Sequence, residues 1–358
     1  MNVAMNKKPI IPIFFAVDDN YAPNLHVTVE SIISQASKDY QYHIVILSEN
    51  LSDRYRRSFI ARSNANFKVM VKDMTRLCAK RGTGFHTRDY YSKTTYFRIF
   101  IPELFPQYTK VIYLDSDVVL NADISELYNH DISGMYAAAA TCETCHTTRR
   151  AFYDYVEKYL GLEFPWYFNA GVLLLNIELL RRENFEARFF DILSKIKFEV
   201  IQDQDYLNVL FRGRVLLLPQ IWNKIARKRD GYDGSNVKLI HYNLYYRPWR
   251  YDVDELPPDD RTLDFEDIFW KHAKNSPAYG ELLEIKKNYG ADKKLYDATW
   301  MTNLEKNAQR HADLPFEETF AGLIFTGKLK LQKFDERACE PEKDWLGFGA
   351  ILESALVN

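Results

Sequence analysis

The sequence predicts an α/β protein with a central sheet of the nucleotide-binding kind. The continuous apolar run at residues 12–17 is typical of a strand buried on both faces, and residues 43–47 and 67–71 are two further strand-like runs. Apolar residues at helical spacing occupy residues 25–36 and 53–65 between these runs. This order of strands and helices is that of a Rossmann-like βαβαβ unit, in which ligands lie at the carboxyl ends of the strands.

The elements expected after this unit are shorter. A helix over residues 91–101 ends at Pro102, because proline disfavours the helical conformation in the residue before it. A strand over residues 110–114 then runs directly into an acidic turn. Further short strands and helices are expected at residues 135–140, 171–175, 185–198, 206–211, 215–218 and 238–241.

Towards the C-terminus the pattern changes. Two exposed helices are expected over residues 264–274 and 278–289, and the mixed, charged residues 291–358 predict no particular element. We therefore expect a principal domain over residues 8–255 and a helical or irregular C-terminal region over residues 256–358.

Composition and charge exclude several classes of protein. The 358 residues carry a formal net charge of −2, so no basic field favours nucleic acid. Four cysteines are too few for a disulfide framework. No signal peptide follows Met1 and no apolar run is long enough to span a bilayer, so the cytoplasm is the expected location. The modestly basic, amphipathic segment 322–334 leaves peripheral contact with the inner face of a membrane open, beside the alternative of a packing or oligomer helix.

The motif Asp115-Ser116-Asp117 directly follows the strand expected at residues 110–114. Two carboxylates that flank one residue can share a divalent cation, and Mg²⁺ and Mn²⁺ prefer oxygen ligands together with substrate phosphates. Such a cation neutralises a diphosphate and stabilises it as a leaving group. Acidic pairs at strand ends also commonly cap the next turn, so the motif alone leaves both interpretations open.

A second polar cluster, Asp18-Asp19-Asn20-Tyr21, ends the first expected strand. It contains neither G-x-G-x-x-G nor a Walker loop, so a nicotinamide dinucleotide is not expected. A carboxylate and an amide can instead hydrogen-bond a uracil edge or a ribose, and Tyr21 can stack on the base. The alternative is an Asx-rich turn that caps the following helix.

Three later loops carry further candidates. The amide of Asn169, ahead of an apolar strand, can hydrogen-bond a sugar hydroxyl or simply form a turn. The run Gln202-Asp203-Gln204-Asp205 can line a sugar and reaction centre, or can only begin a helix with favourable acidic residues. His241 and Arg247 offer a metal ligand and a phosphate-binding cation, although a lone His at a strand end is usually structural.

The run Cys142-Glu143-Thr144-Cys145-His146 matches the pattern of c-type haem attachment. Haem attachment normally requires export. A zinc site requires a second pair of ligands, and the remaining cysteines, Cys78 and Cys339, are not paired in the sequence. We interpret the run as a chance match in a loop, with a dithiol of a reducing compartment as the alternative.

Together and in this order, the motifs resemble those of glycosyltransferase family 8, the retaining galactosyl- and glucosyltransferases that include bacterial lipopolysaccharide enzymes and resemble glycogenin. The motifs are Asp18-Asp-Asn-Tyr21, Tyr113-Leu-Asp-Ser-Asp117, Phe168-Asn-Ala-Gly-Val172, Asp203-Gln-Asp205 and His241 with Arg247-Pro-Trp249. The resemblance covers about residues 10–250. It implies an α/β fold of the GT-A type, a Rossmann-like nucleotide-binding domain with a mixed central sheet, followed by a helical C-terminal extension.

The resemblance also implies roles for single residues. Those expected to contact the donor are Asp18, Asn20, Tyr21, Arg98, Asp115, Asn169, Asp203, Gln204, His241 and Arg247. The first three would hold the uridine, while Asn169, Asp203 and Gln204 would surround the sugar. Asp115 and Asp117 would bind Mn²⁺ or Mg²⁺ with His241 as the third protein ligand, and Arg247 stands where the family usually has Lys.

The implied activity is transfer of a hexose from UDP-glucose or UDP-galactose to a glycan acceptor, with retention. As nucleophiles of a double displacement, Asp203 and Asp205 are conceivable and the amide of Gln204 is not. We expect a front-face attack beside the departing UDP instead, with Gln204 and Asp203 orienting the sugar. The sequence identifies neither the acceptor nor an oligomeric state.

One position departs from the family pattern. The family usually has Gly three residues after the metal-binding His, and this chain has Leu244. A leucine adopts the backbone of such a glycine less freely, so Arg247 would reach the phosphates by another path or the loop would pack differently. Leu244 therefore keeps open the alternative of a catalytically silent sugar-nucleotide or glycan-binding module. A sugar-1-phosphate nucleotidyltransferase is less compatible, because it would want a Gly-rich basic loop where Asp18 and Asp19 stand.

Overall fold

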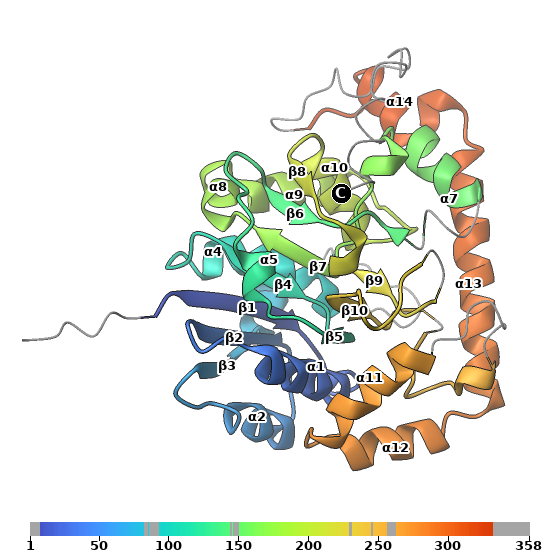
Figure 1. Ribbon diagram of the computed structural model, residues 1–358. Coiled ribbons are helices and arrows are strands. Elements are labelled where there is room, and N and C mark those ends of the chain that lie inside the picture. Colours follow the sequence, from blue (N-terminus) through green and yellow to red (C-terminus); the bar gives the residue numbers. More distant parts are fainter. Residues whose placement is uncertain are drawn as a thin grey trace, which may run out of the picture.

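A mixed seven-stranded sheet of order β3-β2-β1-β4-β7-β6-β8 forms the centre of the computed structural model (Figure 1). The structure describes residues 8–81, 85, 93–143, 145, 150–228, 231–244, 246–255 and 263–331. The strands are β1 (Ile10–Ala16), β2 (Gln41–Ser48), β3 (Phe67–Asp73), β4 (Val111–Leu114), β6 (Ala137–Ala139), β7 (Val172–Leu175) and β8 (Val215–Leu217). Strands β1 to β4 run parallel, whereas β7 is antiparallel to both β4 and β6, so the expected mixed sheet is confirmed.

A second, three-stranded sheet lies beside the first and was only partly expected. It consists of β5 (Val118–Leu120), β10 (Leu239–His241) and β9 (Lys224–Ile225). Strand β10 pairs antiparallel with β5, which places His241 opposite Val118. This pairing brings a segment from late in the chain next to the acidic turn that follows β4.

Helices flank the sheets. They are α1 (Ala22–Gln35), α2 (Asp53–Ile60), α3 (Thr75–Arg81), α4 (Ile101–Leu104), α5 (Ser125–Tyr128), α7 (Arg150–Asp154), α8 (Ile177–Arg182), α9 (Phe185–Lys195), α10 (Asp203–Phe211), α11 (Leu263–Lys274), α12 (Tyr279–Lys287), α13 (Ala291–Ala312) and α14 (Phe320–Phe325). Of these, α1, α2, α9, α10, α11 and α12 lie where the sequence predicts helices. Shorter turns of 3₁₀ or π type are η2 (Lys93–Phe100), η3 (Tyr155–Tyr159), η4 (Phe164–Trp166), η5 (Gln220–Trp222), η6 (Val253–Glu255) and η8 (Phe316–Glu318).

Apolar layers cover both faces of the large sheet. On β1, Ile13 and Phe15 join a buried layer that includes Leu25 of α1. Their neighbour Phe14 points to the other face and joins a layer that includes Phe100 of η2. Burial on both faces explains why β1 is a continuous apolar run rather than an alternating one.

The helix expected over residues 91–101 is wrong in type and in its end. The described part is the 3₁₀ helix η2, and the chain continues into α4. Pro102 lies in the first turn of α4, where a missing backbone N–H removes no helical hydrogen bond. Helix α10 likewise begins earlier than expected, at Asp203, so its acidic residues form the first helical turn.

The C-terminal helices α11 and α12 exist, but they are not exposed on all sides. Phe265, Phe269 and Leu282 are buried against Tyr242 and Trp249, which follow β10. Amphipathic helices bury one apolar stripe in this way, and the high charge of the other face conceals it in the sequence.

The long helix α13 lies in the region where the sequence predicted no element. It runs along one side of the molecule, past α7 and η3 (Figure 1). Its residues Trp300, Leu304 and Ala308 follow at intervals of four and join the core around Tyr155 and Tyr159 of η3. The C-terminal region therefore shares its apolar cores with the preceding part of the chain.

None of the helices within the described ranges has the length and apolarity needed to cross a membrane. The segment 322–334, which was considered for membrane contact, begins in α14, where Gly322 and Ile324 are buried. Its residues 332–334 lie outside the described part of the chain.

Candidate active site

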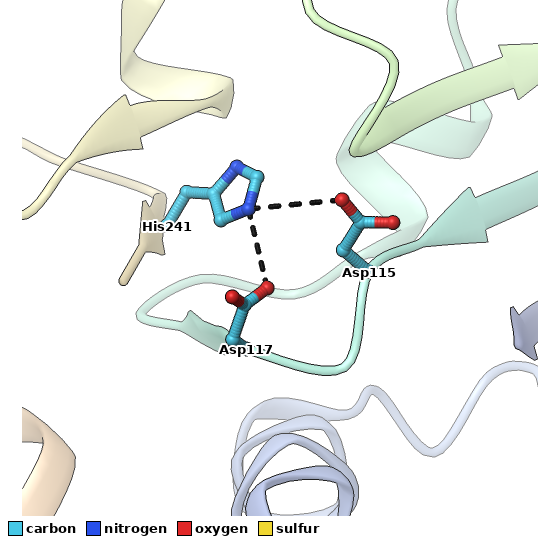
Figure 2. Close-up of side chains that lie close together, drawn as sticks. All are labelled: Asp115, Asp117 and His241. Carbon is cyan, nitrogen blue, oxygen red and sulfur yellow. Dashed lines mark ion pairs between the residues drawn. The ribbon is translucent and has the colours of Figure 1, made fainter. Parts of the chain in front are cut away.

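Three side chains form a compact cluster of metal-ligand type where the two sheets meet. Asp115 follows β4, Asp117 precedes β5, and His241 ends β10. The Nε2 atom of His241 lies 3.2 Å from Oδ1 of Asp117 and 3.8 Å from Oδ2 of Asp115 (Figure 2). One ligand atom from each residue lies within 4.8 Å of the other two, so a single cation fits among them. Two carboxylates and an imidazole are a donor set suited to Mn²⁺.

The charges of this cluster are mutually adjusted. Burial alone would raise the pKa of the Asp117 carboxyl, but His241 and then Arg247 hold that pKa below its usual value. Burial opposes the charged form of His241, yet Asp117 and then Asp115 raise its pKa above the usual value. The two carboxylates therefore favour a positive charge between them, which a bound cation would supply.

A close backbone approach explains the glycine beside the cluster. A Cβ atom at Gly171 would lie 2.4 Å from Cε1 of His241 and 2.6 Å from Oδ2 of Asp115. No side chain fits there. Gly171 therefore allows the backbone just before β7 to lie directly against His241 and Asp115. Its carbonyl also accepts a 2.7 Å hydrogen bond from the backbone N–H of Asp115, which fixes the acidic turn.

Arg98 of η2 connects this cluster to the start of α10. Its Nη2 donates to Oδ1 of Asp115 at 3.0 Å, and its Nε lies 3.2 Å from Oδ2 of Asp203. The guanidinium carbon lies 4.2 Å from the ring centroid of Tyr113. Arg98 is 5% exposed, and two carboxylates compensate its buried charge.

Asn169 and Gln204 place two amides in the wall of the cavity. Gln204 Oε1 accepts from Nδ2 of Asn169 at 3.2 Å and from the N–H of Ala170 at 3.0 Å. Asp203 accepts a 2.7 Å hydrogen bond from the hydroxyl of Thr95. The preceding Gln202 has a φ of +48°, so a strained backbone delivers Asp203 and Gln204 to the cavity wall.

Asp205, considered in the sequence as a conceivable nucleophile, points into the core instead. It accepts hydrogen bonds from the hydroxyls of Tyr155 (2.9 Å) and Tyr167 (2.6 Å) and from the N–H of Ile201 (2.8 Å). Burial raises its pKa to about 6. It is not among the residues that line the cavity, and three donors already occupy its carboxylate.

The turn after β1 also lines the cavity. Asp18 and Tyr21 line it, and Asp18 Oδ1 also accepts from the N–H of Asn20 at 3.0 Å. Asp18 therefore forms the Asx turn of one interpretation and also lines the cavity, as the other interpretation requires. Asn20 is exposed and lies outside the lining residues.

The loop after β10 carries Leu244 and Arg247 to the cavity. Leu244 has a φ of +56°, in the left-handed region that favours glycine. The leucine therefore adopts the backbone type of a glycine, while its side chain packs against the core and lines the cavity. Arg247 lines the same cavity and is 3% exposed.

Several residues of this site were missed in the sequence. Asn223 bonds to both His241 and Asn169, and Trp300 and Leu304 of α13 close part of the cavity wall. Cys142, set aside as part of a chance match, lies 3.7 Å from Nε2 of Gln204. No local motif assigns any of these residues to a sugar-nucleotide site, so only the fold brings them there.

Comparison with known proteins agrees with this fold. The sequence model of Glycosyl transferase family 8 matches residues 12–253. A putative glycosyltransferase of Haemophilus influenzae is 31% identical over 230 residues, which are 64% of this chain and 67% of that protein. The lipopolysaccharide 1,2-glucosyltransferase of Escherichia coli K12 is 24% identical over 298 residues, covering 80% of this chain and 86% of the relative.

Solved structures show the same fold. The bifunctional glycosyltransferase WbbM superposes with a TM-score of 0.64 and 26% identity over 80% of this chain, which spans about half (53%) of the WbbM chain. The galactosyltransferase LgtC, solved with donor and acceptor sugar analogues, gives a TM-score of 0.58 and 24% identity over 75% of this chain and 96% of its own. The fold is thus of the GT-A type, and the chain belongs to glycosyltransferase family 8.

Proposed function

We propose that the protein is a metal-dependent, retaining hexosyltransferase that moves glucose or galactose from a UDP-sugar to a glycan acceptor. The acceptor would belong to lipopolysaccharide, another cell-surface polysaccharide or a glycoprotein glycan, as the names of the lipopolysaccharide relatives suggest. The observation that carries the proposal is the cluster of Asp115, Asp117 and His241 in the wall of a cavity that also contains the amides of Asn169 and Gln204.

The cavity offers a place for each part of the donor. Asp18 and Tyr21 at the end of β1 would hold the uridine, and Asn20 would have to turn inwards to join them. Asp115, Asp117 and His241 would hold Mn²⁺ or Mg²⁺, which neutralises the diphosphate when it is bound. Arg247 would add a second positive charge on the leaving UDP.

Within this proposal, the sugar meets Asn169, Asp203 and Gln204. Asp203 is held in place by Arg98 and Thr95, so its carboxylate can orient a sugar hydroxyl without rotating freely. Its ion pair with Arg98 makes Asp203 a weak nucleophile. The three hydrogen bonds to Asp205 argue against that residue in the same role.

These contacts favour attack of the acceptor on the same face that UDP leaves. Mass spectrometry of enzyme quenched during turnover checks the choice. No sugar adduct on Asp203 or Asp205 is expected, and a trapped adduct on either residue would establish a double displacement instead.

The main alternative is a catalytically silent sugar-nucleotide or glycan-binding module, which Leu244 kept open. The left-handed backbone of Leu244 supports the catalytic proposal, because the loop bends as it would with glycine. Release of UDP separates the two functions. The purified protein is incubated with a panel of UDP-sugars and Mn²⁺, with and without a chelator. Chelator-sensitive UDP release from UDP-glucose or UDP-galactose supports the enzyme, and binding without any release supports the module.

The proposal retains a principal domain over residues 8–255 and a C-terminal region over residues 256–358, from which Trp300 and Leu304 reach the cavity. It also retains a cytoplasmic location and leaves contact with the inner face of a membrane as an open question. Co-sedimentation with anionic lipid vesicles at low salt measures that contact directly, and protein that stays in the supernatant would remove it from the proposal.

A further inference from the structure

A continuous chain of side-chain hydrogen bonds runs from the candidate metal ligand to the candidate sugar site. His241 Nδ1 lies 2.9 Å from Oδ1 of Asn223, and Asn223 Nδ2 lies 2.9 Å from Oδ1 of Asn169. Asn169 Nδ2 then lies 3.2 Å from Oε1 of Gln204, whose Nε2 lies 3.7 Å from Sγ of Cys142. Asn223, which makes the first two of these contacts, is 2% exposed.

Two backbone N–H groups fix the direction of this chain. The N–H of Gly171 lies 2.9 Å from the side chain of Asn169, and the N–H of Ala170 lies 3.0 Å from the side chain of Gln204. A backbone N–H can only donate, so each of these two side chains presents its oxygen there. The nitrogen of Asn169 is then directed to the oxygen of Gln204, and the two anchors agree with one another.

The orientation of Asn223 follows from that of Asn169. The oxygen of Asn169 already faces the N–H of Gly171, so Asn223 must meet the same oxygen with its NH₂ group. The opposite orientation would set two carbonyl oxygens against each other. Consequently the oxygen of Asn223 faces His241, and the Nδ1 atom of His241 must carry a proton.

The position of Asn223 is itself secured by the chain around it. Its backbone N–H donates to the carbonyl of Gln220 at 3.0 Å. Its carbonyl accepts from Nε2 of Gln220 at 2.7 Å. The residue therefore stands in a closed 3₁₀ turn before β9, beside the strand that carries His241.

We propose that Asn223 is a positioning residue that fixes the imidazole of His241 with a proton on Nδ1, so that Nε2 can offer its lone pair to a cation held between it, Asp115 and Asp117. The inference rests on the proposed function and extends it to a residue outside every motif of the sequence. A metal-binding imidazole needs its other nitrogen to donate to a fixed acceptor, and loss of such an acceptor typically weakens metal binding by about 10–100-fold.

The same residue connects two parts of the reaction. Through its oxygen Asn223 orients the metal ligand, and through its nitrogen it holds Asn169 and, beyond it, Gln204. The two halves of its amide can therefore be separated by mutation. Asn223→Ala removes both contacts. Asn223→Asp keeps the oxygen that accepts from His241. It replaces the NH₂ group that donates to Asn169 with a second carboxylate oxygen, which cannot donate and faces the oxygen of Asn169.

The first readout is the affinity for Mn²⁺ alone, measured from the electron paramagnetic resonance signal of free Mn²⁺ without any nucleotide. Asn223→Ala should weaken binding about 10–100-fold, whereas Asn223→Asp should stay close to wild type. The second readout is kcat and KM for UDP release from the donor sugar at saturating Mn²⁺. Asn223→Asp should be impaired here although its metal site is intact, because Asn169 and Gln204 lose their fixed orientation.

A matched control separates this effect from general destabilisation. Asn176→Ala removes a helix cap, the 3.1 Å hydrogen bond to the N–H of Leu179 at the far end of β7, and touches no residue of the chain described above. It should lower the melting temperature and leave the Mn²⁺ affinity unchanged. Circular dichroism shows which variants fold. If Asn223→Ala does not fold, Asn223→Asp still tests the inference through its Mn²⁺ affinity and its rate of UDP release.

The outcomes are distinguishable. Wild-type Mn²⁺ affinity in a folded Asn223→Ala protein would overturn the inference and leave the proposed function standing. Equal loss of affinity in the Ala and Asp variants would also overturn it, because an acceptor for Nδ1 would then not matter. A wild-type protein that neither binds Mn²⁺ nor releases UDP would overturn the proposed function and the inference together.

Discussion

The backbone approach of Gly171 to the metal cluster allows a quantitative prediction for Gly171→Ala. The new Cβ would lie 2.4 Å from Cε1 of His241 and 2.6 Å from Oδ2 of Asp115, where ordinary contacts begin at 3.4 Å. The imidazole must therefore retreat by about 1 Å and the carboxylate by about 0.8 Å, the differences between these distances. Metal–ligand distances are held to about ±0.2 Å, so both shifts exceed what a bound cation tolerates.

We expect Gly171→Ala to weaken Mn²⁺ binding by about 10–100-fold and to lower UDP release by about 100-fold. Overpacking of this kind costs about 1–3 kcal/mol, so the free energy of unfolding should fall by a similar amount. Titration of free Mn²⁺ by electron paramagnetic resonance measures the first effect, and urea unfolding measures the last.

Gly280→Ala is the matched control for this variant. Gly280 lies in α12, where a Cβ atom would meet nothing within 4 Å, and alanine is the better helix former by about 0.5–1 kcal/mol. The control should fold at least as stably as wild type and bind Mn²⁺ equally. Wild-type Mn²⁺ affinity in Gly171→Ala would refute the reasoning, since the ligands would then have room that the structure does not show.

Three further predictions follow from buried charges and from the strained loop. Arg98→Met leaves Asp115 and Asp203 without their shared cation and should cost about 3–5 kcal/mol of stability, measured by urea unfolding; a loss below about 1 kcal/mol would show that the pair is not held as described. Burial raises the pKa of Asp205 from 3.8 to about 6, so folding favours the protonated carboxyl. The resulting stabilisation is complete below about pH 4. It falls by about 3 kcal/mol as the pH rises through 6. The wild-type stability should therefore drop between about pH 4 and 6 relative to that of Asp205→Asn, and parallel pH profiles of the two proteins would contradict the assignment. At Leu244, φ +56° is tolerated by Asn but strained for a β-branched residue, so Leu244→Val should unfold about 1–3 kcal/mol more easily than Leu244→Asn, and equal stability would contradict the left-handed backbone.

The first strands were predictable because burial on both faces leaves a direct trace in the sequence. Residues 12–17 read as a strand since Ile13, Phe14 and Phe15 are all fully buried, on opposite faces of the sheet. Helix α13 was not predictable in the same way. Its apolar residues Trp300 and Leu304 stand among charges, and only packing against η3 makes them a core.

The same distinction applies to the candidate site. Asp115-Ser116-Asp117 is a local motif and could be found directly. His241 was a candidate ligand by residue type, and only the resemblance joined it to Asp115 and Asp117. Asn223 left no trace, because a single Asn after Trp222 is indistinguishable from any loop residue until β9 and β10 pair. Leu244 was judged by residue type alone, which cannot reveal that the fold imposes a left-handed backbone on it.

The central claim is that Asp115, Asp117 and His241 hold a cation that stabilises a leaving UDP. The most direct measurement is the rate of UDP release from the preferred UDP-sugar at saturating Mn²⁺, compared between wild type and Asp117→Ala. Asp131→Ala is the control, because Asp131 does not line the cavity. The account predicts a loss of about 100-fold or more for Asp117→Ala, since the cation contributes several kcal/mol to the transition state, and none for Asp131→Ala. Equal release by wild type and Asp117→Ala would contradict it.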